Sequence, residues 1–231
     1  MKKRAGWIFA YLFTIAGAVL SVHWGSRAVT VVSEHMPIAR QNCVVIDPGH
    51  GGVDGGATSC TGRLESAYNL EISLKLRDLL HFIGYDVKMI RTADESVYTE
   101  GETIAQKKLS DLKQRVKIAN ETPGGVLISI HQNQFPDQSS SGGQVFYAGT
   151  QGSDVLASLV QKQMAVSLKP KTTRREKKSS GVYLMEHIQC PGILIECGFL
   201  SNPQEEARLS DSSYQKKLCC VIAVSLKQFL G

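Results

Sequence analysis

The stretch CVVIDPGHGG, residues 43–52, indicates both the fold class and the first candidate site. Its short apolar run predicts a buried β-strand, and Pro48 with Gly49 ends that strand in a glycine-rich loop. Downstream, apolar residues at helical spacing predict a helix over about 65–83, and Gly84 follows as a helix-ending residue. The folded part of the chain therefore begins with a strand and a helix, the unit from which parallel sheets are built.

The same alternation continues along the chain. Further strands are expected at 85–90, 126–130, 144–147, 182–185 and 193–195, and further helices at about 103–120, 154–168 and 213–230. Strands separated by helices predict the α/β class: a single domain with a mostly parallel twisted sheet flanked by helices on both faces. Ligands of such sheets bind beyond the carboxyl ends of the strands.

The N-terminus has the pattern of a membrane-targeting segment. A basic cluster at Lys2–Arg4 precedes an uncharged, mostly apolar run over 5–22, which at about 1.5 Å per residue is just long enough to cross a bilayer core. Such a segment is typical of an export signal or an uncleaved anchor, and either places the following domain outside the cytoplasmic membrane, secreted or anchored there. The expected organisation is a signal peptide or membrane anchor at 1–27, a linker at 28–40 and one folded domain at 41–231.

Composition excludes several classes of protein. With 42% hydrophobic and 20% charged residues, the 231-residue chain is typical of a globular protein. Four basic residues and no acidic ones lie in the first 27 positions, so the remaining chain carries only +1 of the net charge of +5, which argues against a nucleic-acid partner. The six cysteines form no Cys-x-x-Cys pair, so neither a zinc finger nor a disulfide scaffold is expected.

Polar side chains follow three of the expected strands. His50 lies just after the first strand, His131 ends the strand beginning at 126, and Glu196 follows the strand at 193–195. Imidazole and carboxylate groups at one sheet edge suit Zn²⁺. With the two histidines as ligands, Glu65, at the start of the first helix, can supply the third. Glu196 would then act as the general base that takes a proton from the attacking water.

Four motifs resemble those of a known family. They are VVIDPGHGG (44–52), ESAYNL (65–70), SIHQN (129–133) and IECGFLSN (195–202). In this order they are similar to the zinc-dependent N-acetylmuramoyl-L-alanine amidases of the bacterial cell wall, and the match runs from about residue 43 to 231. The resemblance implies hydrolysis of the amide between the lactyl group of muramic acid and the L-alanine of the stem peptide. It also implies one zinc ion held by His50, Glu65 and His131, with Glu196 as the catalytic residue.

Within this family the chain looks most like the small, membrane-targeted, germination-specific amidases of spore formers, which act on cortex peptidoglycan in preparing muramic lactam. That resemblance implies a forespore intermembrane location and a lipoprotein partner as activator. Only 11 residues separate His131 from Gly143, so the inhibitory helix of cell-division relatives is not expected. Gln134 departs from the small residue that many relatives carry there, at the rim of the expected site.

Other residues leave alternatives open. Arg175, in a basic stretch that is otherwise a solvated loop, is a candidate for binding stem-peptide carboxylates, and Asn133 is a second candidate substrate-binding residue. Asp47 is expected to brace its loop or to orient a ligand histidine. Cys197 permits a cysteine amidase as an alternative to the metal enzyme, although packing is the expected role of its thiol. A general wall-remodelling amidase and a non-catalytic peptidoglycan-binding protein are the remaining alternatives.

Overall fold

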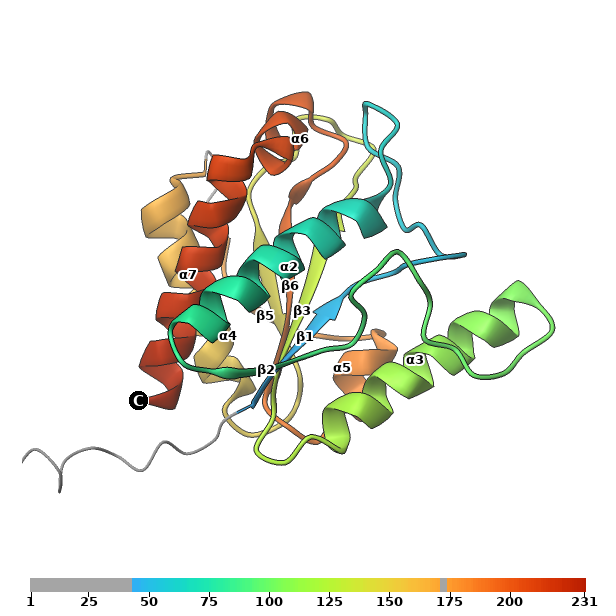
Figure 1. The fold of residues 1–231 in the computed structure, drawn as a ribbon. Helices are drawn as coiled ribbons and strands as arrows, with labels where there is room; N and C mark the ends of the chain where they lie inside the picture. The colour runs from blue at the N-terminus through green and yellow to red at the C-terminus, as the bar shows by residue number, and fades with distance from the viewer. Residues whose placement is uncertain (1–42, 171–173) are drawn as a thin grey trace, which may run out of the picture. The chain divides into compact units, whose positions relative to one another are not determined.

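A computed structural model describes residues 43–170 and 174–231, which form a six-stranded sheet with helices on both faces (Figure 1). The expected membrane-targeting segment and linker lie outside these residues. In the part of the chain that the structure describes, no helix is both long and apolar enough to span a membrane.

The sheet has the strand order β2-β1-β3-β6-β4-β5. Four neighbouring strands are parallel, β4 runs antiparallel to β6, and the short β5 pairs parallel with β4 at the edge. The expected α/β class and mostly parallel sheet are thus confirmed. The bounds are β1 Cys43–Pro48, β2 Asp86–Met89, β3 Val126–Asn133, β4 Gln144–Tyr147, β5 Lys177–Lys178 and β6 Gly192–Phe199.

Alternating side chains on the strands divide the core between the two faces. The larger cluster contains Val44 and Ile46 of β1 and packs beneath α2, α4 and α7, whereas Val45 belongs to the second cluster beneath α3 and α5 (Figure 1). Both faces of β1 are therefore buried, as expected for an inner parallel strand. The helices are α2 Glu65–Phe82, α3 Ile104–Asn120, α4 Ser153–Leu168, α5 Tyr183–His187, α6 Pro203–Ser210 and α7 Ser212–Leu230.

Local signals explain where several helices begin. Thr103 and Gln106 form a capping box at α3, and Asn202 accepts two backbone N–H groups at the start of α6. Asp211 caps α7 by accepting the N–H of Tyr214. Each cap satisfies backbone donors that have no partner within the helix.

The prediction of a strand at 182–185 is wrong, because the chain forms the short helix α5 here. Val182 is extended, but the chain then turns so that Leu184, Met185 and Ile188 are buried in the second core cluster. The i, i+1, i+4 spacing of these three apolar residues fits one face of a helix better than one face of a strand. The place at the edge of the sheet is taken instead by β5, which precedes this helix.

Candidate metal centre

The structure brings together the three side chains that the sequence predicts as metal ligands. His50 lies in the loop after β1, Glu65 is the first residue of α2 and His131 lies near the end of β3. His50 Nε2 is 3.3 Å from Glu65 Oε2, and His131 Nδ1 is 3.0 Å from Glu65 Oε1. One ligand atom from each residue can be chosen so that all lie within 4.8 Å of one another. Two nitrogens and one carboxylate oxygen at this spacing fit a tetrahedral zinc site with an open fourth position.

Glycines make this close approach possible. A Cβ at Gly49 would lie 2.2 Å from the imidazole of His131, and one at Gly56 would lie 2.6 Å from Glu65 Oε2 and 2.7 Å from His50 Cδ2. His50 itself has a φ of 59°, in the left-handed region that non-glycine residues rarely adopt. The loop between β1 and α2 is thus shaped around the two imidazoles and the carboxylate.

Glu65 is held by donors from three segments. Only 4% of the residue is exposed, and its carboxylate accepts hydrogen bonds from the N–H groups of Ala57 and Gln132 and from Asn69 Nδ2. Burial acts to raise the pKa of Glu65, but its hydrogen bonds and electrostatic interactions with His131 and His50 outweigh this effect and hold the pKa far below its usual range. Glu65 is therefore ionised, the form that a metal requires of a carboxylate ligand.

Asp54, which the sequence did not single out, orients His50. Its Oδ2 lies 3.0 Å from His50 Nδ1, which leaves Nε2 facing Glu65. The same carboxylate oxygen lies 3.1 Å from Lys108 Nζ on α3. A carboxylate on the far nitrogen of a ligand histidine fixes its tautomer and ring orientation. The available signal was the i, i+4 spacing of Asp54 from His50 in the glycine-rich loop.

Asp47 braces the loop and binds neither imidazole. Its carboxylate accepts a hydrogen bond from Ser129 Oγ at 2.6 Å and forms an ion pair with Arg115, both partners being buried. Arg115 also donates to the carbonyl oxygen of His50 at 2.7 Å. The bracing role expected of Asp47 is confirmed, and it acts through an arginine of α3 that the sequence reading missed.

Glu196 lies on β6 at the rim, paired in register with His131 of β3. The residue is half-buried, and its Oε2 is out of contact with solvent and has no hydrogen-bond partner among the described residues. Burial raises the pKa of Glu196 to about 7, against an opposing electrostatic effect of His131. A carboxyl group with a pKa near neutral can both accept and return a proton at physiological pH.

Cys197 does not share this position. It is 1% exposed and belongs to the core cluster beneath α2, α4 and α7, on the opposite face of β6 from its neighbour Glu196. Burial raises the pKa of its thiol far above the usual value, so the sulfur remains protonated. A nucleophilic cysteine needs the thiolate and access to substrate, and Cys197 has neither.

The structure leaves the two candidate substrate-binding residues as predictions. Arg175 is exposed, and its carbonyl oxygen accepts a hydrogen bond from the side chain of Gln144, which pairs in register with Glu196. Arg175 thus lies just before β5, beside the end of β4 that pairs with Glu196. Asn133 lies at the end of β3, where its carbonyl oxygen accepts the N–H of Leu200 at 2.8 Å.

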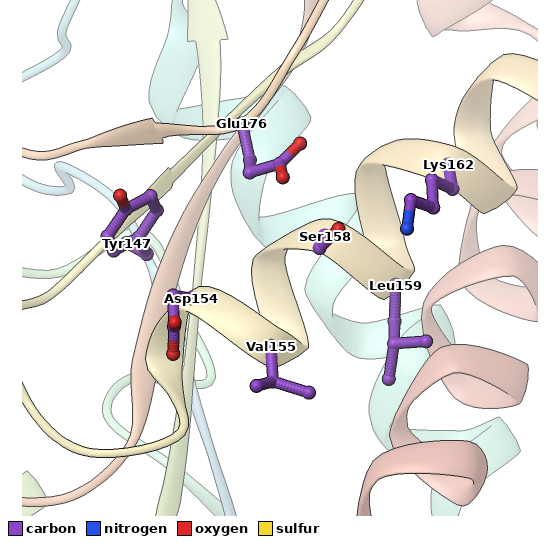
Figure 2. A pocket seen from close by; sticks show the side chains of 7 residues that line it. All are labelled: Tyr147, Asp154, Val155, Ser158, Leu159, Lys162 and Glu176. Carbon is purple, nitrogen blue, oxygen red and sulfur yellow. The ribbon is translucent and has the colours of Figure 1, made fainter.

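A pocket of about 470 Å³ lies away from the metal centre (Figure 2). It opens between α4 and the β4–β5 edge of the sheet, with Tyr147 and Glu176 across from Asp154 and Lys162. None of the predicted metal or catalytic residues lines it. Its mixed charges indicate no ligand class, so the strand-end site remains the candidate for the chemistry.

Comparisons with known proteins identify the family to which the chain belongs. The sequence profile of a family described as N-acetylmuramoyl-L-alanine amidase matches residues 44–228. The germination-specific N-acetylmuramoyl-L-alanine amidase of Bacillus subtilis is 41% identical over 225 residues, covering 96% of this chain and 93% of that protein.

Two solved structures show the same fold. The CwlD amidase of Clostridioides difficile, determined in complex with the GerS lipoprotein, is 34% identical with a TM-score of 0.78, covering 82% of this chain and 98% of that one. An N-acetylmuramoyl-L-alanine amidase from Clostridium difficile 630 is 33% identical with a TM-score of 0.70, covering 81% and 96%.

Proposed function

The chain belongs to the N-acetylmuramoyl-L-alanine amidase family, and from that premise we propose that it is a zinc-dependent enzyme of the spore cortex. Its activity on peptidoglycan follows from the family; the metal, the residue roles and the cortex substrate are the proposal. The observation that supports it most is the convergence of His50, Glu65 and His131 beside a half-buried Glu196.

In this proposal the three ligands hold one zinc ion per chain. Zinc bound there supplies a Lewis acid that polarises a carbonyl group and lowers the pKa of water. Asp54 keeps His50 Nε2 directed at the site, and the donors around Glu65 keep its carboxylate ionised. Two imidazole nitrogens and one carboxylate oxygen suit Zn²⁺ better than Ca²⁺ or Mg²⁺, since those ions prefer more oxygen ligands.

Glu196 moves the protons of the reaction. Its carboxylate takes a proton from the water whose oxygen forms the new bond to the lactyl carbonyl carbon. The same group then gives a proton to the nitrogen of L-alanine as the carbon–nitrogen bond breaks. One water is consumed, and the products are a lactyl carboxylate on the glycan and a free amino group on the stem peptide. The low exposure of Glu196 favours this double role, because it brings the pKa of the carboxyl group near neutrality.

The test combines metal analysis with a cleavage assay on the full-length chain. Metal content is measured by mass spectrometry, and cleavage of purified peptidoglycan is followed before chelation, after chelation and after zinc is restored. We expect one zinc per chain, with activity lost and regained. Glu196→Gln should retain zinc and lose cleavage, whereas His50→Gln should lose both. Metal-independent cleavage would refute the mechanism, and zinc-replete binding without cleavage would favour a non-catalytic binding protein.

The cortex role and a lipoprotein partner rest on the relatives. The Bacillus subtilis relative is named germination-specific, and the Clostridioides difficile relative was solved with a lipoprotein, so we propose the same setting for this chain. Expression in a Bacillus subtilis strain lacking its germination-specific amidase should restore muramic lactam in the cortex. Cleavage of vegetative wall without restored lactam would instead favour a general wall-remodelling amidase.

Export and substrate binding complete the proposal. Residues 1–27 would direct the domain across the cytoplasmic membrane, and Arg175 and Asn133 would contact the stem peptide. Fractionation with an antibody to the chain locates the protein. Replacing Arg175 by alanine should raise KM for peptide-bearing glycan while kcat is retained, and an unchanged KM would remove Arg175 from the site.

A further inference from the structure

Arg91 is a buried arginine that donates hydrogen bonds to the backbone next to the candidate metal centre. It follows β2, and only 2% of the residue is exposed. Its guanidinium donates to four backbone carbonyl oxygens: Nε to Pro48 at 2.8 Å, Nη2 to Gly49 at 3.0 Å and to Ser66 at 2.9 Å, and Nη1 to Ala93 at 2.8 Å. The planar guanidinium directs its donors rigidly, so these bonds fix the positions of the carbonyl groups relative to one another.

Two of those carbonyls belong to residues adjacent to predicted ligands. Gly49 immediately precedes His50, and Ser66 immediately follows Glu65. Both are bonded to the same nitrogen, Nη2 of Arg91. A single atom therefore links the loop after β1 to the first turn of α2, the two segments that must come together to form the site.

The surrounding chain is shaped to admit this side chain. A Cβ at Gly51 would lie 2.8 Å from Arg91 Nε, so the glycine permits the guanidinium to reach the loop. From the α3 side, Arg115 Nη2 donates to the carbonyl of His50, and Arg115 Nη1 donates to the Pro48 carbonyl that Arg91 Nε also reaches. The carbonyl groups of Gly49 and His50, on either side of the left-handed turn, are thus each held by an arginine donor.

We propose that Arg91 is a positioning residue for the metal centre, which sets the separation of His50 and Glu65 through its shared contact with Gly49 and Ser66. The inference rests on the proposed zinc site. It assigns to Arg91 the role of fixing the distance between His50 and Glu65, on which the affinity for zinc depends. Its effect is predicted on zinc binding itself, beyond the general loss of stability that follows any change to a buried arginine. Removing a group that hydrogen-bonds a metal-ligand side chain directly typically alters metal affinity by about 10–100-fold, and we expect an effect of the same order from these backbone contacts.

The test measures zinc affinity and folding stability separately in the full-length chain. Arg91→Met removes the donors, and Arg91→Lys keeps the charge while losing the planar arrangement that reaches both carbonyls. Gln215→Met is the matched control, because Gln215 is fully buried in α7 and donates to the carbonyl of Leu209 at 2.7 Å. The zinc dissociation constant is determined by competition with a chelator, the geometry from visible absorption of the Co²⁺ form, and stability from thermal unfolding of the metal-free protein.

Both Arg91 variants should bind zinc about 10–100-fold more weakly than wild type and show an altered Co²⁺ spectrum. Gln215→Met should bind zinc as wild type does, even if its melting temperature falls by as much as that of the Arg91 variants. If Arg91→Met does not fold, Arg91→Lys carries the comparison. Folded Arg91 variants with wild-type zinc affinity would overturn the inference and leave the proposed function intact. Wild-type protein that binds no zinc would overturn the proposed function and this inference with it.

Discussion

Replacing Glu196 by glutamine should slow cleavage severely and at the same time stabilise the metal-free protein at alkaline pH. The pKa of this carboxyl group is about 7 in the folded chain and 4.5 for an unburied glutamate. At about 1.4 kcal/mol per pH unit, that difference corresponds to about 3 kcal/mol. Because the pKa is raised on folding, the stability contributed by the protonated form is present below pH 4.5 and is lost as pH rises from 4.5 through about 7.

The expected signature is a pH-dependent difference between the two proteins. Glutamine cannot ionise, so the gain in unfolding free energy from Glu196→Gln should be about 3 kcal/mol larger at pH 8 than at pH 4.5. For a domain of this size the corresponding rise in melting temperature is about 6–12 °C. Subtracting one pH from the other removes any constant cost of burying the new amide.

Urea and thermal unfolding of the metal-free proteins at the two pH values measure this difference, and a muropeptide assay of the zinc-loaded proteins measures cleavage. A fall of about 10²–10⁴ in kcat is expected for loss of a general base. An equal effect of the substitution at both pH values would show that burial does not perturb Glu196, and wild-type cleavage by the variant would remove it from the reaction.

Three further predictions concern the residues around the site. Gly49→Ala should keep the far-UV circular dichroism of wild type yet lose bound zinc, since its Cβ would lie 2.2 Å from the His131 ring; one retained zinc per chain would contradict this. Asp47→Asn should cost about 3 kcal/mol in urea unfolding by leaving the buried Arg115 short of a charged partner, and a cost below about 1 kcal/mol would show that the pair is not stabilising the loop. Cys197→Ala should leave kcat unchanged and cost about 1 kcal/mol of stability, and inactivation of the native enzyme by iodoacetamide at this thiol would refute the buried assignment.

The strand-end logic predicted which side chains come together because it depends on period and order alone. Parallel strands end at one edge, so His50, His131 and Glu196 could be placed together from the sequence, and Glu65 followed from its position at a helix start. Arg91 could not be recognised in this way. A buried arginine that binds carbonyls has the same sequence signature as an exposed one, and its acceptors are backbone atoms that leave no pattern in the sequence.

The short helix α5 shows a different limit. Val182 and Tyr183, where it begins, favour strands, and the four-residue segment expected as a strand contains too few residues to distinguish a period of two from one of 3.6. Packing of Leu184 and Met185 beneath the sheet decided the outcome. Such tertiary preference overrides local propensity most easily in elements of one or two turns.

Strand alternation explains why Asp47 and Asp54 have different roles, and it could have been applied before the structure was known. Val45 faces α3 and α5, so Asp47, two residues later, faces the same side and meets Arg115 of α3. The chain then leaves the strand, and the left-handed turn at His50 brings its ring towards Glu65, delivered by α2 from the opposite face. Asp54 lies beyond that turn, and its carboxylate contacts His50 Nδ1, the ring nitrogen that does not face Glu65. The centre therefore lies at the end of β1, where α2 on one face of the sheet supplies Glu65 and α3 on the other supplies Arg115. Its geometry depends on both helical layers being in place.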